Sequence, residues 1–356
     1  MRLRRAGAVL TTLALVGVTV GAASAQAARD DGVALGVATV ESQDVPVAGT
    51  FAYNARQDDT KDEIRGVVHA VRRVDGGTAL YYSIGSPGPD SVRGAGMFLQ
   101  AQDHDDIPFA WDVKLIDTAN LRAYRPLRTS EGLATSVSSD LTSEGDLHVA
   151  FAVFPELPAD VTEVQVVVAN GTSVGAVQVE DGALEPVADE PAPRPGQGWP
   201  ALPDAALLAT ADPEDRTFVL TRRSGDLAGD VQVEESPEQV GVVLDASVLF
   251  AFDSADLAPE AQGRLAEVAA DIAARGSGEV VVTGYTDSDG ETRYNQTLSE
   301  QRAQSVVAAL QPAAGGAVTF TAVGEGERDP VASNDTDEGK QANRRVTIVY
   351  SVEGDR

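Results

Sequence analysis

An acidic and a basic side chain near residue 290 are spaced so that both can act on one ligand. The β-branched run Val280–Thr283 predicts a buried strand, and the polar loop after it carries Asp287. Ser299 is a favourable N-cap residue and predicts a helix from Ser299 to Leu310. Arg302 then lies one turn into the helix, so its side chain and that of Asp287 can converge over a single loop. This pair suits a ligand that carries both an ammonium and a carboxylate group.

Two other interpretations fit the same residues. From spacing alone, an internal salt bridge between Asp287 and Arg302 that orders the loop is the simpler hypothesis. The segment Asp287–Glu291 also matches part of a calcium loop, which spaces oxygen ligands over about twelve residues and ends with a bidentate Glu. Leu298 occupies that final position here. The sequence therefore predicts no metal ion and no cofactor.

Three motifs in this region, taken in order, resemble the signature of the OmpA/MotB C-terminal domain. They are GYTDSDG at Gly284–Gly290, NQTLSEQRA at Asn295–Ala303 and NRRV at Asn343–Val346. The resemblance extends over about residues 240 to 350, and members of this family are non-catalytic modules that hold peptidoglycan. Many members have His at the position of Tyr285. Because tyrosine retains an aromatic ring and a hydrogen-bonding tip, we expect binding to be tuned there and not lost.

The resemblance implies roles for seven residues. Asp287 is expected to accept hydrogen bonds from the ammonium group of the diaminopimelate side chain in the wall peptide. Arg302 is expected to hold the carboxylate of the same side chain by a forked pair of hydrogen bonds. A helix-ending turn is an equal alternative role for Asn343. The other expected roles are ligand contact or loop bracing for Asn295, contact with the same carboxylate region for Arg344, backbone bracing for Asn343, a place on the rim for Asp253, and ligand contact for Thr286.

The sequence predicts an α+β fold. Residues 236–354 are expected to form a βαβαβ domain with a final strand, whose helices pack on one mixed sheet. The segments 240–244 and 248–252 predict one entry strand or a pair of strands. The other expected elements are a helix over 257–274, the strand over 279–283, the helix over 299–310, and strands over 318–323 and 345–350.

Residues 30–185 are expected to form a β-rich, sandwich-like domain. The segments 66–74 and 78–84 predict one hairpin, and the segments 164–168 and 173–179 predict another around an Asn-Gly turn. Short strands at regular spacing are typical of a sandwich. A membrane β-barrel is less favoured, because it needs longer alternating strands with aromatic girdles and aromatic residues are only 5% of the chain.

The remaining segments connect or target these domains. Residues 186–203 are rich in proline and predict an extended linker, and 204–235 form a lead-in segment with a strand near Thr217. Residues 1–28 combine a basic start, an apolar stretch and small-residue cleavage sites, which is typical of a secretory signal peptide that is removed. An uncleaved membrane anchor is the alternative.

Composition excludes several functional classes. The net charge of −28 and the pI near 4.3 disfavour nucleic acid as a partner, because phosphate contacts need clustered Lys and Arg. The chain has no cysteine, which excludes disulfides, thiolate zinc sites and a Cys nucleophile. Gly171–Gly175 matches the nucleophile-elbow pattern around Ser173, but a strand is predicted where that motif needs a helix. The residues His69, His104 and His148 show no metal-binding spacing.

Together these observations predict an exported, non-enzymatic protein of the cell envelope. Its C-terminal domain is expected to bind peptidoglycan without a covalent bond, and its N-terminal domain to face a protein partner. One alternative is a wall-anchored enzyme or adhesin whose activity lies in the N-terminal domain. Another is an outer-membrane barrel with a periplasmic tail. The sequence predicts no oligomeric state.

Overall fold

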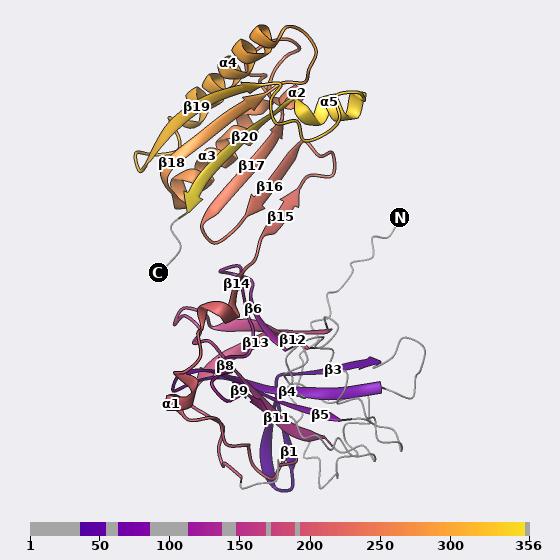
Figure 1. Cartoon of the computed structure of the whole chain (residues 1–356), viewed down its shortest axis with the longest axis vertical. Helices are drawn as coiled ribbons and strands as arrows, with labels where there is room; N and C mark the ends of the chain where they lie inside the picture. The colour runs from indigo at the N-terminus through magenta and orange to yellow at the C-terminus, as the bar shows by residue number, and fades with distance from the viewer. Residues whose placement is uncertain are drawn as a thin grey trace, which may run out of the picture. The chain divides into compact units, whose positions relative to one another are not determined.

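The chain folds into two compact units. In a computed structural model, the described residues are 36–54, 63–85, 113–136, 147–168, 172–188 and 193–352. The N-terminal unit contains residues 1–116 and 124–216, and the C-terminal unit contains residues 117–123 and 217–356 (Figure 1). The expected signal peptide, 1–28, lies outside the described residues. None of the helices in the described part of the chain has the length and apolar character needed to span a bilayer.

The N-terminal unit is built of strands. Its main sheet runs in the order β10-β11-β5-β4-β13-β12-β6, and β3 pairs with β4. The members of this path are β3 (Gly49–Asn54), β4 (Glu63–Val74), β5 (Gly77–Gly85), β6 (Lys114–Asp117), β10 (Thr135–Ser136), β11 (His148–Phe154), β12 (Glu163–Val168) and β13 (Thr172–Asp181). The shorter elements are β1 (Gly36–Val40), β2 (Gln43–Val47), β8 (Arg128–Thr129), β9 (Gly132–Leu133), α1 (Ala205–Leu208) and the 3-10 turn Glu214–Arg216. Two further strands, β7 (Arg122–Tyr124) and β14 (Thr217–Val219), lie in the sequence at boundaries between the two units.

Both predicted hairpins are confirmed. Strands β4 and β5 pair antiparallel, and so do β12 and β13. Strand β13 also pairs in parallel with β4, which joins the two hairpins into one hydrogen-bonded path. The division of these strands into two packed sheets therefore stays a prediction. Ser173 lies within β13, so the elbow pattern at this serine is followed by strand and not by helix.

Strand β5 is buried along its whole length because both of its faces are covered. Leu80 and Tyr82 point into one apolar cluster, which they share with Val166 of β12. Tyr81, on the opposite face, belongs to a second cluster together with Trp199. A strand covered on both faces needs a continuous apolar run instead of an alternating one, which is what the sequence of β5 provides.

The described residues of the predicted Pro-rich linker pack against the N-terminal unit and do not form a free spacer. Trp199 is only 2% exposed, and its ring makes edge contacts with Tyr81 at 5.6 Å and with His69 at 5.1 Å between centroids. Val149 N donates to the carbonyl of Pro193. Proline supplies an extended backbone, but burial of the large Trp ring holds this tract against the sheet. The lead-in is also divided, since α1 belongs to the N-terminal unit.

His69 is buried in a neutral form beside this Trp ring. Its Nδ1 lies 2.6 Å from the Pro46 carbonyl oxygen, and its Nε2 lies 2.5 Å from the Ser83 hydroxyl. A carbonyl only accepts hydrogen bonds, so Nδ1 carries the hydrogen and Nε2 accepts from Ser83. Burial lowers the pKa of His69 to about 4. The imidazole therefore links three segments of the unit without carrying a charge.

This burial predicts an acid-sensitive N-terminal unit. The unfolded chain protonates His69 below about pH 6.5, whereas the folded unit resists protonation until about pH 4. Stability is therefore unaffected above pH 6.5 and falls as the pH is lowered toward 4, by about 1.4 kcal/mol at pH 5.5. Urea unfolding at pH 7.5 and 5.5, followed by tryptophan fluorescence, measures this loss. His69→Gln should be less stable than the original chain at pH 7.5, but its unfolding free energy should not show this decrease between pH 7.5 and pH 5.5. An equal decrease in the two proteins would contradict the prediction.

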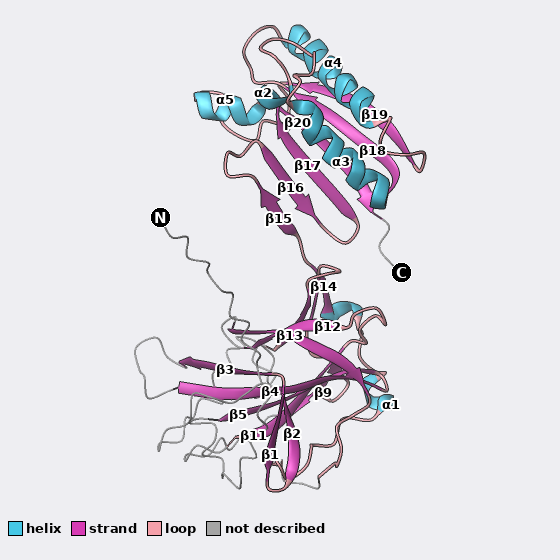
Figure 2. Ribbon diagram, turned by 180° about the vertical axis from the view of Figure 1, so that it is seen from behind, coloured by secondary structure: helices cyan, strands magenta, loops and turns pink. Residues whose placement is uncertain are grey.

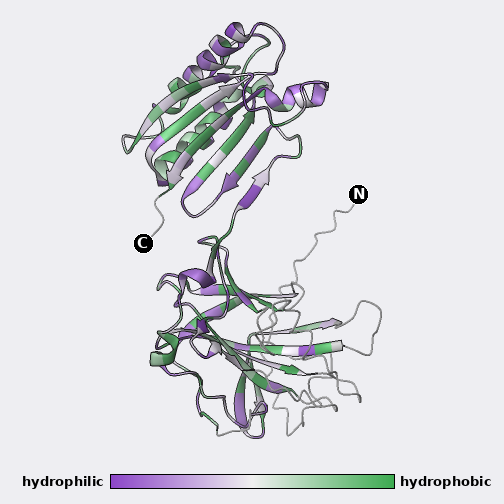
Figure 3. Cartoon of the chain, in the orientation of Figure 1, coloured by the Kyte–Doolittle hydropathy of each residue, from purple (hydrophilic) through white to green (hydrophobic). Residues whose placement is uncertain are grey.

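The C-terminal unit is a six-stranded mixed sheet with two long helices on one face (Figure 2). The strand order is β15-β16-β17-β20-β18-β19, in which only β18 and β19 are parallel. Figure 3 shows hydrophobic residues along the central strands and hydrophilic residues along α5. The elements are β15 (Arg222–Gly225), β16 (Val231–Glu235), β17 (Gln239–Asp245), α2 (Ala246–Leu249), α3 (Ala261–Arg275), β18 (Gly276–Tyr285), α4 (Thr292–Leu310), β19 (Val318–Gly326), α5 (Asp337–Asn343) and β20 (Arg345–Val352). The prediction of helices packed on one mixed sheet is confirmed.

Two predicted helix starts in this unit are wrong, and of the two alternatives for the entry segment the single strand, β17, forms. Helix α4 begins at Thr292, and Ser299 lies inside it, because the buried Ser299 hydroxyl accepts from Gly326 N and donates to the carbonyl of Gln296. The second entry strand over 248–252 does not form, because the Asp245 carboxylate accepts from Ser247 N and starts the short helix α2. Helix α3 begins at Ala261, four residues later than expected.

Helix α4 lies directly on β18 and β19 because the strands present glycine to it. A Cβ atom at Gly284 would stand 2.2 Å from the carbonyl oxygen of Ser299, and one at Gly324 would stand 2.6 Å from Glu300 N. Both neighbours are helix backbone, which cannot move aside as a side chain can. The two glycines therefore set the distance between the helix and the sheet.

This contact predicts that Gly284→Ala destabilises the C-terminal unit by about 1–3 kcal/mol, as overpacking does. Gly263→Ala in α3 is the matched control, because a Cβ there has no neighbour within 4 Å. Replacing a helical glycine with alanine should stabilise the unit by up to about 1 kcal/mol. Thermal unfolding of both variants measures these opposite shifts. A Gly284→Ala protein as stable as the original chain would show that α4 can move away from the sheet.

Candidate functional site

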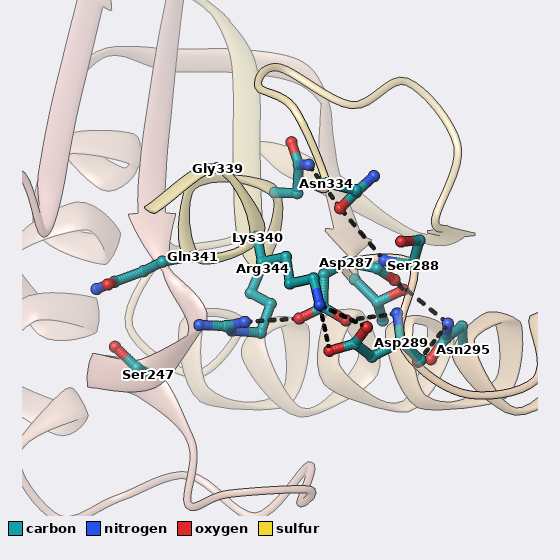
Figure 4. Close-up of polar contacts among 12 residues, drawn as sticks. Ser247, Asp287, Ser288, Asp289, Asn295, Asn334, Gly339, Lys340, Gln341 and Arg344 are labelled. Carbon is teal, nitrogen blue, oxygen red and sulfur yellow. Dashed lines mark hydrogen bonds and ion pairs between the residues drawn. The ribbon is translucent and has the colours of Figure 1, made fainter. Parts of the chain in front are cut away.

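Three segments that are far apart in the sequence meet at one end of the C-terminal sheet (Figure 4). The first is the loop between β18 and α4, and the second is the loop Asn334–Thr336 that leads into α5. The third is Arg344, which lies between α5 and β20. Asp287, Asn334 and Arg344 are all drawn in this group. The short loop after β18 allows this meeting, because Asp287 follows the strand by only two residues.

Asp287 is a buried carboxylate that is already paired. It is 8% exposed, and its Oδ2 lies 2.6 Å from Nη1 of Arg344. Its Oδ1 accepts from Asp289 N at 3.1 Å. The alternative prediction of a salt bridge between Asp287 and Arg302 is therefore wrong, because the cation that pairs with the Asp287 carboxylate is Arg344.

Arg302 projects from α4 with one end of its guanidinium fixed. It is 5% exposed, and Nε donates to the carbonyl oxygen of Ser254 at 2.9 Å. The guanidinium also lies over the Phe250 ring, 5.2 Å from its centroid. Among the residues that the structure describes, neither terminal nitrogen of Arg302 hydrogen-bonds to protein. The group therefore presents a fixed pair of unoccupied donors.

The electrostatic surroundings of Arg302 contain both signs of charge. Burial lowers the pKa of Arg302, and the positive charge of Arg344 lowers it further. The negative charges of Asp253 and Asp287 raise this pKa and partly offset the effect of burial. The normal pKa of arginine is far above neutral, so Arg302 remains a cation. The charges of Asp253, Asp287 and Arg344 therefore all act on the Arg302 guanidinium, and the convergence of Asp287 and Arg302 on one ligand stays a prediction.

Asn295 and Thr286 brace the loop that carries Asp287. The Asn295 amide is buried and donates to the carbonyl oxygens of Asp287 at 3.3 Å and Asp289 at 3.0 Å. Thr286 N donates to the Gly326 carbonyl, and its hydroxyl donates to the carbonyl of Asp287. Of the two roles considered for Asn295, loop bracing is the one that these contacts favour.

Asn343 fixes the segment before α5. Its Oδ1 accepts from the backbone N of Val331 and Ala332, and its Nδ2 donates to Ala332 O and to Asn334 Oδ1. Asn334 Oδ1 in turn accepts from Ser288 N, so the bracing continues to the loop of Asp287. Asn343 is also the last residue of α5, so both roles considered for it fit one residue.

Asp253 lies on the rim and contacts a tyrosine of α4. Its Oδ1 accepts from the Tyr294 hydroxyl at 2.7 Å, and this hydrogen bond raises the pKa of Tyr294. Asp253 has a φ of +54°, in the left-handed region, so the turn that holds it is strained. The rim role expected for Asp253 stays a prediction.

The sequence did not indicate two further interactions at the site. Lys340 Nζ lies 2.8 and 3.0 Å from the two oxygens of Asp289 and ties α5 to the loop. The buried Arg345 guanidinium stacks over the Tyr285 ring, 3.7 Å from its centroid. Arg345 lies beside Arg344 in the NRRV motif, and this position was the sequence feature that could have indicated a role for Arg345. No group of three or more potential metal ligands occurs within the described ranges.

The fold and these residues define a small α/β domain with a cluster of paired charges at one end of its sheet. The model of the OmpA family matches residues 249–344. Putative lipoprotein YfiB of Escherichia coli is 37% identical over 121 residues, which are 33% of this chain and 74% of that protein. The chain belongs to the OmpA family.

Other comparisons cover a similar share of the chain. Outer membrane protein A of Bordetella avium is 39% identical over 113 residues, which are 32% of this chain and 58% of that protein. A solved structure described as the cell wall anchor of the T6SS from Pseudomonas aeruginosa is 37% identical, with a TM-score of 0.33. It covers 35% of this chain and 90% of that one. The chain therefore spans little more than half of the Bordetella relative.

The bracing role of Asn343 can be tested apart from any ligand. Asn343→Ala removes four hydrogen bonds that the buried Asn343 side chain makes within the unit. The expected loss of stability is about 2–4 kcal/mol, because each hydrogen bond contributes about 0.5–1.5 kcal/mol. Asn334→Ala, which removes a more exposed partner of the same network, should lose less. Thermal unfolding ranks the two variants, and the reverse order would contradict the bracing role.

Proposed function

We propose that the C-terminal unit binds peptidoglycan without a covalent bond and holds the diaminopimelate side chain of the wall peptide. Membership of the OmpA family supports a role in the cell envelope, since relatives are named as an outer membrane protein and as a lipoprotein. The diaminopimelate assignment has separate support from the charges at the site. That side chain ends in one ammonium and one carboxylate, so it needs one acid and at least one fixed cation.

The observation that carries the proposal is the half-anchored guanidinium of Arg302. Its Nε is held by the Ser254 carbonyl, which orients the two free terminal nitrogens as a fork. Such a fork matches the two oxygens of a carboxylate. Little rotamer entropy remains to be lost on binding, since the side chain is buried and oriented before the ligand arrives.

Asp287 can accept the ligand ammonium while it keeps its hydrogen bond from Asp289 N. An ionised carboxylate has about four lone-pair sites on its two oxygens. Asp289 N and Arg344 use two of them here. The ligand can therefore bind with its ammonium on Asp287 and its carboxylate between Arg302 and Arg344. Arg344 then turns from Asp287 toward the ligand carboxylate, which preserves the charge balance of the pocket.

The same proposal includes export and a binding role for the whole chain. The signal-peptide pattern of residues 1–28 supports export with cleavage. The residues proposed for the site bind the charged groups of the ligand, and none of them is assigned as a general acid or base for cleaving a bond. We therefore propose that the C-terminal unit is an attachment module and not an enzyme. The N-terminal unit is proposed to contact a protein partner.

Binding of the full chain to a diaminopimelate-containing tripeptide tests the proposal. Asp287→Ala and Arg302→Ala should each weaken binding more than about tenfold. Removing one member of a buried charge pair costs about 2–5 kcal/mol, and a tenfold change needs only about 1.4 kcal/mol. Arg302→Lys should also bind weakly, because an ammonium group cannot reproduce the fork.

Arg222→Ala is the matched control, because Arg222 lies on β15 and pairs with Glu235 outside the site. This variant loses the same charge and should bind as the original chain does. Thermal unfolding of every variant separates loss of binding from loss of fold. Normal binding by folded Arg302→Ala protein would remove the site assignment.

A further inference from the structure

A groove adjoins the site on the helix-free face of the C-terminal sheet. The side chains of Val240, Val242 and Leu244 point into the helix-covered core, so Gln232 and Val243, which pair across β16 and β17, face the opposite side. Two hollows lie there, of about 390 and about 480 Å³. Both hollows are lined by Gly229, Gln232 and Val243, so they adjoin at these residues, and together they are here called the hairpin groove.

The hairpin groove is built largely by residues that the family model does not match. The model begins at residue 249, whereas β15, β16 and β17 all end before it. The turn between β15 and β16 is fixed by Asp226, whose Oδ1 accepts from Asp230 N, and by Arg264, which pairs with both acids. The wall of the groove is therefore an ordered part of this unit.

The groove is continuous with the proposed site through Arg344. Arg344 lines the first hollow together with Gln341 and Ala342 of α5. The same guanidinium lies 2.6 Å from Asp287. Figure 4 draws Arg344 between Gln341 and Asp287. A ligand held by Asp287 and Arg302 therefore has a path past Arg344 into the groove.

Most charges along the groove are already compensated. Arg223 pairs with Glu234 at 2.9 Å, and Asp226 pairs with Arg264. The Asp245 carboxylate accepts from Gln341 at 3.1 Å and from Ser247 N.

What remains for a ligand is small apolar surface, amide groups and backbone, contributed by Ala228, Gln232, Val243, Gln341 and Ala342. The first hollow is also lined by the acids Asp245 and Glu338, while its two arginines are engaged with Asp287 and with the Tyr285 ring. Such a lining suits an uncharged ligand that carries hydroxyl and acetamido groups better than it suits a carboxylate.

We propose that the hairpin groove binds the N-acetylated glycan strand of peptidoglycan, next to the stem peptide held at Asp287 and Arg302. This inference rests on the proposed function of that site. In the polymer the sugar next to the stem is uncharged, because its acid group is consumed in the amide bond to the peptide. The further residues of the stem, in contrast, carry free carboxylates, which the acids Asp245 and Glu338 of the lining would repel.

The reach of the ligand agrees with this arrangement. Three residues join the glycan to the diaminopimelate side chain, and an extended chain spans about 3.3–3.6 Å per residue. A sugar can therefore lie roughly 10 Å from the diaminopimelate group. This reach is sufficient to pass the guanidinium of Arg344, which is 2.6 Å from Asp287 and also lines the first hollow. Each hollow is within the size range of small-ligand pockets.

The test compares two soluble ligands on the full chain: the tripeptide alone, and the same tripeptide joined to its N-acetylated disaccharide. The original chain should bind the disaccharide form about fivefold tighter or more, because the sugar adds buried contacts. Gln232→Trp should bring this ratio to within about twofold by filling the groove, while its affinity for the tripeptide stays unchanged. Gln239→Trp is the matched control, since Gln239 is an exposed residue of β17 that lines neither hollow.

Each outcome decides between the proposals. If the original chain binds both ligands equally, or if Gln232→Trp keeps the full ratio, the groove proposal is overturned while the proposed function stands. If a stem extended by one D-alanine without sugar gains affinity that Gln232→Trp removes, the groove holds peptide and the glycan assignment is wrong. If neither ligand binds, both proposals fall together.

Discussion

The direct contact of helix α4 with the glycines of β18 and β19 is the constraint on which the site depends. With no side chain between them, the helix backbone approaches the sheet closely enough for Ser299 to accept a hydrogen bond from Gly326 N. Asp287 follows Gly284 by three residues, and Arg302 follows Ser299 by three residues. The contact that fixes the helix therefore also fixes the distance between the acid and the arginine. A larger residue at either glycine would displace both ends of the pocket together.

The sequence predicted the residues of the site more reliably than their contacts. Local signals were sufficient for the buried strand, the following loop and the presence of a helix, because each depends on a few neighbouring residues. The start of α4 was wrong because Ser299 has the chemistry of an N-cap, while its actual partner, Gly326, is contributed by a distant strand. The pairing of Asp287 with Arg344 was missed for the same reason, because 57 residues separate them. Such a pair can be recognised only after the sheet has brought its strands together.

The N-terminal unit shows the same limit on a larger scale. Alternating and continuous apolar runs identified both hairpins, but nothing local indicated that β13 would pair in parallel with β4. The proline-rich tract predicted an extended linker, because proline content carries information about the backbone alone. Trp199 in the same tract brings a large apolar ring, and its burial against Tyr81 and His69 decides where the tract lies. In both units, polar residues within the core, such as His69 and Ser299, link the segments that the sequence pattern left unassigned.

The ion pair between Asp287 and Arg344 has a kinetic consequence for any ligand that uses the same carboxylate. Arg344 acts as an intramolecular competitor, present at a high effective concentration because it is tethered to the site. A departing ammonium group is replaced at once by the guanidinium, so the acid is never left buried and uncompensated during release. The proposed attachment to the wall would therefore exchange quickly while each bound state remains specific. A protein held in this way could detach and rebind as the polymer around it is cut and extended.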